Sequence, residues 1–177
     1  MKKPILMPKA LLAIFLALIS SLISCNSGKS KNESYNASSP KGSVSFKSGY
    51  SDVNGIKMYY EIYGQGEPLV LIHGGGSTIQ TSFERIIPSL AKNYQVIAVE
   101  LQNHGRSSNR NIPQTFEQDA DDVAALMKNL GVGKANIFGF SNGGETTIQI
   151  GIRYPEMVNK LIVASAPVKR SGFVPGF

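Results

Sequence analysis

A serine between glycines is the segment of this sequence whose residue types and spacing best fit chemistry. Residues 139–144 read G-F-S-N-G-G, so Gly139 and Gly143 stand two positions either side of Ser141. An apolar stretch precedes the segment and a helical pattern follows it, which predicts a sharp strand-to-helix turn. A side chain at either glycine would collide with its neighbours in so tight a turn. The hydroxyl would lie beside a helix N-terminus, whose N–H groups favour the negative charge formed in nucleophilic catalysis.

A second segment with free backbone N–H groups follows a predicted strand. Residues 73–77 read H-G-G-G-S directly after the apolar run 68–72. Consecutive glycines let a backbone approach a ligand closely, so the segment could form half of an oxyanion hole. A plain glycine-rich loop is the alternative. We interpret His73 as a residue that fixes this loop rather than as a catalytic base.

The elements that must position these segments alternate between strands and helices. An antiparallel pair joined by Asn54-Gly55 is predicted first, and alternation along its second strand predicts that Glu61 faces water. The predicted strands cover residues 44–53, 56–63, 68–72, 94–101, 134–138 and 158–164, and the last four read as buried strands of a parallel sheet. The predicted helices cover residues 81–91, 115–130 and 145–154. The first has a capping-box spacing at 81–84 and either a kink or a restart at Pro88.

The other polar residues that could suggest a site receive structural interpretations. His104 stands in a polar turn beside a glycine, and we interpret it as a turn residue. Four acids cluster near the start of the predicted helix 115–130, and we expect them to face water and complement the helix dipole rather than to bind a metal. These acids are Glu117, Asp119, Asp121 and Asp122. The sequence therefore predicts no metal site and no cofactor.

The N-terminal residues predict export and a lipid anchor. Lysines precede the apolar run 10–23, which is short for a membrane span of about 20 residues and matches a secretory signal. Residues 22–25 read L-I-S-C and resemble the lipobox of bacterial lipoproteins. We therefore expect a signal peptide over 1–24, lipidation of Cys25, and location at a bacterial membrane on the periplasmic or cell-surface side. An ordinary signal peptide with a chance cysteine is the alternative.

The segment after the signal peptide predicts a flexible tether, and it also carries most of the net charge. Residues 25–43 are rich in Ser, Asn and Lys without apolar periodicity. The net charge is +6, and the six lysines and one glutamate of residues 1–43 account for +5 of it. The remaining residues are nearly neutral, so the charge distribution indicates no nucleic-acid partner.

Three segments together resemble the α/β-hydrolase fold-1 family in their order and spacing, over about residues 49–167. They are H-G-G-G at 73–76, N-H-G-R-S at 103–107 and G-F-S-N-G-G at 139–144. The resemblance implies an α/β fold with a mostly parallel sheet after two leading antiparallel strands. It also implies a hydrolase of a small-molecule ester or acyl substrate. A serine at the turn argues against the dehalogenase and epoxide hydrolase branches, which use aspartate there.

The resemblance also implies residue roles. Ser141 would be the nucleophile of a nucleophile elbow. The oxyanion donors would be the backbone N–H groups of Gly75 and Asn142, with Gly74 as a further candidate. His73 and His104 would be structural.

The sequence departs from the family pattern in two places. Glu100 and Asn103 stand where the family usually has Asp and Gly, although Asn tolerates the left-handed backbone that such a turn requires. The family orders its triad as serine, acid and histidine, yet only Glu145 and Glu156 among acids, and no histidine, follow the serine. We therefore expect residues 44–177 to be the N-terminal portion of the domain, without the lid, the last strands, the triad acid and the histidine. Such a chain would have little or no activity, and a non-catalytic, membrane-anchored lipoprotein is the alternative.

Overall fold

The computed structural model of the 177-residue chain describes residues 44–167, which lie within one compact unit. The predicted signal peptide 1–24, the lipidation site Cys25 and the tether 25–43 fall outside the described residues. Within residues 44–167, no helix combines the length and the hydropathy needed to cross a bilayer.

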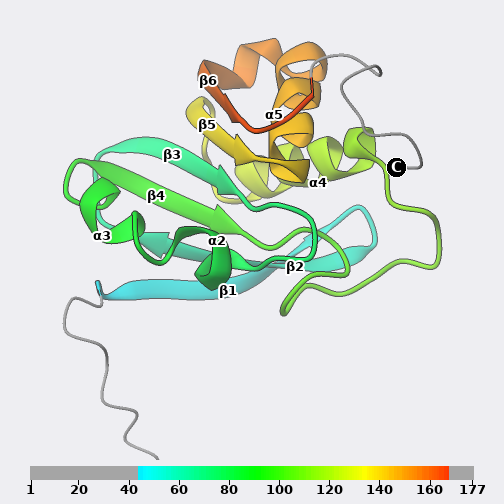
Figure 1. Ribbon diagram of the computed structural model, residues 1–177, viewed down its shortest axis with the longest axis horizontal. Coiled ribbons are helices and arrows are strands. Elements are labelled where there is room, and N and C mark those ends of the chain that lie inside the picture. The colour runs from blue at the N-terminus through cyan, green and yellow to red at the C-terminus, as the bar shows by residue number, and fades with distance from the viewer. Residues whose placement is uncertain (1–43, 168–177) are drawn as a thin grey trace, which may run out of the picture. The chain divides into compact units, whose positions relative to one another are not determined.

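A six-stranded sheet with the order β1-β2-β4-β3-β5-β6 forms the centre of this unit (Figure 1). The strands are β1 (Phe46–Val53), β2 (Ile56–Tyr63), β3 (Glu67–Ile72), β4 (Tyr94–Val99), β5 (Ala135–Phe140) and β6 (Val158–Ala164). The first two strands pair antiparallel, and β2 pairs antiparallel with β4. The pairs β3–β4, β3–β5 and β5–β6 are parallel. The sheet is therefore mostly parallel with two leading antiparallel strands, which confirms the predicted fold class.

Helices cover both faces of the sheet (Figure 1). The helices are α2 (Ile79–Phe83), α3 (Ile87–Leu90), α4 (Phe116–Asn129) and α5 (Asn142–Arg153), followed by the 3-10 turn η1 (Pro155–Met157). Alternate residues of β3 lie on opposite faces of the sheet. Val70 and Ile72 pack with α4 and α5, whereas Leu69 and Leu71 pack with α2 and α3. This explains why the strand is a continuous apolar run, since both of its faces are buried.

The sheet topology brings the two glycine-containing segments together. The chain leaves β3 to form β4 on one side and then crosses over to form β5 on the other side. Carboxyl ends of parallel strands meet at one edge, and the point where the strand order reverses is the usual ligand crevice of such sheets. Ile72 pairs with Gly139, so the residues that follow β3 and β5 emerge side by side.

Two helix starts differ from the sequence-based expectation. The helix α2 begins at Ile79 with Thr78 as its N-cap, and Thr81 completes the capping box in the position usually held by Glu or Gln. The predicted box at 81–84 was therefore wrong. Of the two alternatives left open at Pro88, the structure shows the helix restart, since Pro88 lies in the first turn of α3. The helix α5 begins at Asn142 rather than at residue 145, because Gly143 and Gly144 form its first turn.

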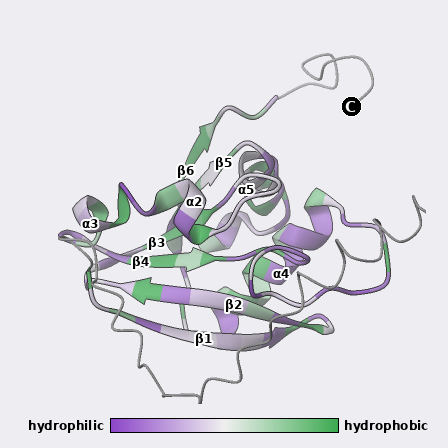
Figure 2. Cartoon of the chain, turned by 60° about the horizontal axis from the view of Figure 1, so that its bottom comes forward, coloured by the Kyte–Doolittle hydropathy of each residue, from purple (hydrophilic) through white to green (hydrophobic). Residues whose placement is uncertain are grey.

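Two strands differ from their expected exposure. Glu61 on β2 is fully buried rather than facing water, because α2 and the turn after β4 cover that face. The strand β6 was expected to be buried, but Leu161, Ile162 and Val163 are 37–48% exposed. The reason is that β6 is the edge strand within residues 44–167, and its apolar stretch lies at the end of the sheet away from β1 (Figure 2).

Candidate active site

Ser141 lies in the sharp turn between β5 and α5. Its φ of 54° and ψ of −117° lie outside the regions that non-glycine residues favour. The Ser141 N–H donates to the carbonyl of Ala164 at 2.8 Å, and the Ser141 carbonyl accepts from Gly144 and Glu145 in the first turn of α5. The Ser141 side chain is partly exposed and makes no hydrogen bond to another described residue.

The flanking glycines are required by close backbone contacts. A Cβ at Gly139 would lie 1.9 Å from the carbonyl oxygen of Gly143. A Cβ at Gly143 would lie 2.1 Å from the carbonyl oxygen of Ile72. Real Cβ atoms do not approach backbone oxygens so closely, so strand, turn and helix can meet at these distances only with glycine at both positions.

The glycine loop after β3 lies against the serine turn. A Cβ at Gly74 would be 3.4 Å from the Cβ of Ser141, and one at Gly75 would be 3.7 Å from the Cβ of Asn142. The next N–H in the loop, that of Gly76, donates to His104 Nε2. The N–H groups of Gly74, Gly75 and Asn142 have no acceptor among the described residues. Three unpaired backbone donors therefore gather next to the serine, as an anion-binding site requires.

Two histidines hold the glycine loop through backbone hydrogen bonds. His73 is fully buried, its Nε2 accepts from the Leu101 N–H at 3.1 Å, and its Nδ1 lies 2.7 Å from the Gly74 carbonyl oxygen. Burial lowers the pKa of His73 to about 4, so its imidazole is neutral at pH 7. The ring of His104 packs on that of His73 with 4.9 Å between centroids. Its Nδ1 lies 2.8 Å from the Gln102 carbonyl oxygen, so all four ring nitrogens contact backbone groups.

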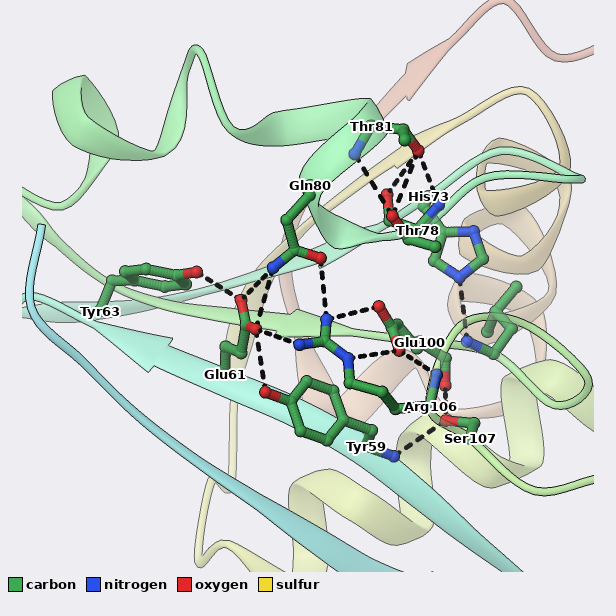
Figure 3. Close-up of polar contacts among 11 residues, drawn as sticks. Tyr59, Glu61, Tyr63, His73, Thr78, Gln80, Thr81, Glu100, Arg106 and Ser107 are labelled. Atoms are coloured by element: carbon green, nitrogen blue, oxygen red, sulfur yellow. Dashed lines mark hydrogen bonds and ion pairs between the residues drawn. The ribbon is translucent and has the colours of Figure 1, made fainter. Parts of the chain in front are cut away.

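A charge cluster of two buried carboxylates and one partly exposed guanidinium fixes the turn that carries His104 (Figure 3). The Arg106 guanidinium donates to Glu100 at 2.6 and 3.1 Å, to Glu61 at 2.9 Å and to Gln80 at 2.8 Å. It also lies 3.7 Å from the centre of the Tyr59 ring. These contacts join β2, the helix α2 and the turn after β4, so the geometry of the site depends on this one cation.

The charges within this cluster do not cancel. Glu61 and Glu100 are both fully buried, and Arg106 is the cation that pairs with them. Burial alone would raise the pKa of Glu100, but hydrogen bonds from Arg106 outweigh burial and hold that pKa below its ordinary value. Hydroxyl groups of Tyr59 and Tyr63 donate to the Glu61 carboxylate and stabilise the charge left over.

The turn that departs from the family pattern contains two left-handed residues. Asn103 adopts a left-handed conformation with φ of 59°, as expected for an Asn at a glycine position. Gly105 is also left-handed, and a Cβ there would lie 2.2 Å from a carboxylate oxygen of Glu100. Glu100 is longer than the Asp that the family usually has at this position. Its side chain therefore fits only because residue 105 is a glycine.

The acids of α4 are not all exposed, which corrects the sequence-based expectation. Asp119 and Asp122 are 1% and 0% exposed. Asp122 pairs with Arg110 at 2.8 Å, whereas the hydrogen bonds to Asp119 come from the side chain of Gln114. Burial was missed because it depends on residues outside the helix, among them Arg110 and Gln114. No group of three or more acids, histidines or cysteines within residues 44–167 is arranged to hold a metal ion.

Comparison with known proteins assigns the fold to one family. The chain belongs to the alpha/beta hydrolase fold family, whose sequence profile matches residues 67–174. The chain is 29% identical over 128 residues to 2-hydroxy-6-oxo-6-(2'-aminophenyl)hexa-2,4-dienoic acid hydrolase of Metapseudomonas resinovorans, covering 71% of this chain and 44% of that protein. It is 33% identical over 120 residues to the serine hydrolase BPHL of Homo sapiens, covering 64% and 41%.

Solved structures show the same relationship. The enol-lactonase from Burkholderia xenovorans LB400 superposes with a TM-score of 0.63 at 28% identity, covering 65% of this chain and 45% of that one. The epoxide hydrolase CorEH superposes with a TM-score of 0.68 at 26% identity, covering 73% and 46%. The chain thus spans less than half the length of these relatives.

Proposed function

We propose that this chain carries the nucleophile and the oxyanion donors of a serine hydrolase that acts on esters or similar acyl compounds. Ser141 Oγ attacks the carbonyl carbon, and the N–H groups of Gly75 and Asn142, with Gly74 as a further donor, bind the oxyanion. Loss of the leaving group gives an acyl-enzyme, and water releases the acid. The printed names of two relatives, a serine hydrolase and an enol-lactonase, support this class of bond.

The backbone strain at Ser141 is the observation that carries this proposal. A non-glycine residue at φ 54° and ψ −117° costs on the order of 1–3 kcal/mol. Glycine would adopt this conformation at lower cost, and the Ser141 side chain makes no hydrogen bond that packing needs. A hydroxyl kept at such a position beside unpaired N–H groups is best explained by the reaction of that hydroxyl.

The proposal assigns the proton-accepting base to residues beyond those of this chain. A serine hydroxyl is a weak nucleophile without a base, and the nitrogens of His73 and His104 already contact backbone groups. In this fold the acid and the histidine follow the serine in the sequence, and residues 142–177 contain neither Asp nor His. Loss of a triad member lowers the rate by on the order of 10⁴–10⁶, so residues 1–177 on their own would acylate slowly.

Replacing Ser141 with alanine is expected to abolish labelling of the full-length protein by a fluorophosphonate probe. The probe reacts with activated serine hydroxyls, and the substitution removes the attacking oxygen while keeping the Cβ. Ser165 provides a matched control, because it is exposed and also left-handed, with φ of 56°. Labelling of Ser165→Ala should equal that of the unchanged protein. Labelling that persists in Ser141→Ala would contradict Ser141 as the nucleophile, and a folded full-length protein that never reacts would favour the non-catalytic lipoprotein.

We also propose that the protein is exported and held at a bacterial membrane by a lipid on Cys25. The basic start, the apolar run 10–23 and the L-I-S-C segment support this. Replacing Cys25 with alanine should move the protein from the membrane fraction to the soluble fraction, because the thiol is the site of lipid attachment. Fractionation with immunodetection measures this, and a Ser24→Ala variant is the control. An unchanged membrane fraction for Cys25→Ala would contradict lipidation.

A further inference from the structure

A pocket of about 400 Å³ adjoins the serine turn. It lies between the start of α4 and the first residue of α5, and it is lined by Gln114, Thr115, Phe116, Glu117, Asp119 and Asn142. Its volume is in the range of small-molecule sites. Because Asn142 directly follows Ser141, a compound whose carbonyl lies at the serine could extend into this pocket.

The buried carboxylate of Asp119 has few partners for an anion. Asp119 is 1% exposed, and its hydrogen bonds come from a single nitrogen, Gln114 Nε2, at 2.9 and 2.7 Å. A carboxylate can accept about four hydrogen bonds. The nearby Arg110 is paired with Asp122, and no lysine or arginine lines the pocket. Asp119 therefore lacks a cationic partner among the described residues.

A second polar group at the same pocket is unpaired. The amide nitrogen Nδ2 of Asn142 is buried and has no acceptor among the described residues. Glu117, which is exposed, adds negative charge to the lining. The pocket thus presents two carboxylates that favour a cation and one amide that can donate to an oxygen, beside an aromatic ring from Phe116.

We propose that this pocket binds the protonated amine of an ester substrate, with the Asp119 carboxylate as its counter-ion and the Asn142 amide as a donor to a substrate oxygen. The proposal rests on the proposed function, because it places the ester carbonyl at Ser141. It narrows the substrates to esters with an ammonium group a few atoms from the carbonyl. A buried charge-assisted hydrogen bond of this kind contributes on the order of tenfold or more in affinity.

The free-energy cost of burying the charged Asp119 carboxylate supports a functional role for this residue. Burial raises the pKa of Asp119 to about 6, against the effect of the Gln114 hydrogen bonds. Of the ionisable groups that face it, Asp122 also raises the pKa of Asp119, whereas His104 and Arg110 lower it. Because the folded-state pKa of Asp119 lies above the ordinary 3.8, the folded protein binds this proton more tightly than the unfolded chain does. The resulting stabilisation is fully present below about pH 4 and is lost as pH rises through 6. Sites that bind charged substrates often retain such costs.

Binding of matched esters to the full-length protein tests this inference. The Ser141→Ala background prevents turnover, and isothermal titration at pH 7.5 compares methyl esters of 3-aminopropanoic, 4-aminobutanoic and 5-aminopentanoic acids with methyl butanoate, pentanoate and hexanoate. Each pair differs only by an ammonium in place of a terminal methyl group. We expect at least one amino ester to bind about tenfold tighter than its neutral counterpart. Adding Asp119→Asn should reduce this ratio to about one, whereas adding Glu156→Gln, which changes an exposed acid outside the pocket lining, should leave it within about twofold.

Thermal unfolding provides the folding control for Asp119→Asn. Removing the buried charge should raise the melting temperature at pH 7.5 and leave it nearly unchanged at pH 4.5, so a lost preference would not reflect misfolding. Equal affinities within every pair, or a preference that survives Asp119→Asn, would overturn the inference. Because binding is measured without turnover, these outcomes are independent of fluorophosphonate labelling. Failed labelling with retained amine preference would instead contradict the proposed reaction.

Discussion

Replacing Arg106 with methionine is expected to destabilise the protein by about 3 kcal/mol, the lower end of the cost of removing one partner of a buried ion pair, because the Arg106 side chain is itself 36% exposed. The substitution keeps the length of the side chain but leaves Glu61 and Glu100, both fully buried, without their cation. Equilibrium unfolding in urea at pH 7 measures the change. The site should be affected too, because Arg106 fixes the turn whose His104 holds the Gly76 N–H.

The pH dependence of this loss follows from the Glu100 pKa. Arg106 holds that pKa below its ordinary value of 4.5, so the stabilisation exists above about pH 4.5 and disappears as pH falls through the lower folded-state pKa. The deficit of Arg106→Met should therefore be largest at neutral pH and smaller in acid. A deficit that does not change with pH would contradict the electrostatic explanation.

Lys57 provides the matched control for the loss of a cation. Its ion pair with Asp52 has the same length of 2.9 Å as that between Arg106 and Glu61, but its side chains are 67% and 81% exposed. Exposed pairs contribute about 0–1 kcal/mol, so Lys57→Met should change the free energy of unfolding by less than about 1 kcal/mol. Similar losses for the two variants would mean that burial of the paired carboxylates does not determine the cost of losing the cation.

Replacing Gly143 with alanine is expected to eliminate Ser141-dependent labelling and to destabilise the fold by about 3 kcal/mol or more, at or above the usual cost of overpacking. The added Cβ would lie 2.1 Å from the carbonyl oxygen of Ile72 and 2.6 Å from that of His73. Both atoms are backbone, so no side-chain rotation can relieve the contact. The helix must move away from β3, which separates the serine from the glycine loop.

Gly133 is the control for this substitution. It lies in an exposed loop, has no positive φ, and a Cβ there would meet no atom within 4 Å. Gly133→Ala should therefore leave labelling unchanged and alter stability by less than about 1 kcal/mol, with stabilisation the expected direction. Labelling that persists in Gly143→Ala at the normal rate would show that the serine turn does not need the close contact between α5 and β3.

Features that depend on short stretches of chain were predictable from the sequence. Apolar runs located the parallel strands, and Asn54-Gly55 located the first turn, where both residues have positive φ. The left-handed Asn103 was predictable for the same reason, since few residues tolerate that backbone. The adjacency of the glycine loop and Ser141 followed from the family resemblance and from two parallel strands ending at one edge of a sheet.

Features that depend on distant partners were not predictable. Glu61 reads as a solvent-facing residue, but α2 covers it and Arg106, 45 positions later, pairs with it from a side chain that is itself 36% exposed. Asp119 reads as a helix-capping acid until the packing of α4 buries it. The start of α2 was missed because two threonines form a reciprocal pair that is usually made with a glutamate. In each case the local sequence pattern favours a simpler structure than the one that contacts with other residues produce.

The open edge at β6 has a consequence for how the chain behaves in concentrated solution. Leu161, Ile162 and Val163 occupy a seven-residue strand without proline, and no other strand pairs with its outer side in the part of the chain that the structure describes. Such a strand is a template on which identical strands can stack into cross-β aggregates. Lys160 is the one charge within it that opposes stacking. Colloidal stability therefore depends on what occupies this edge.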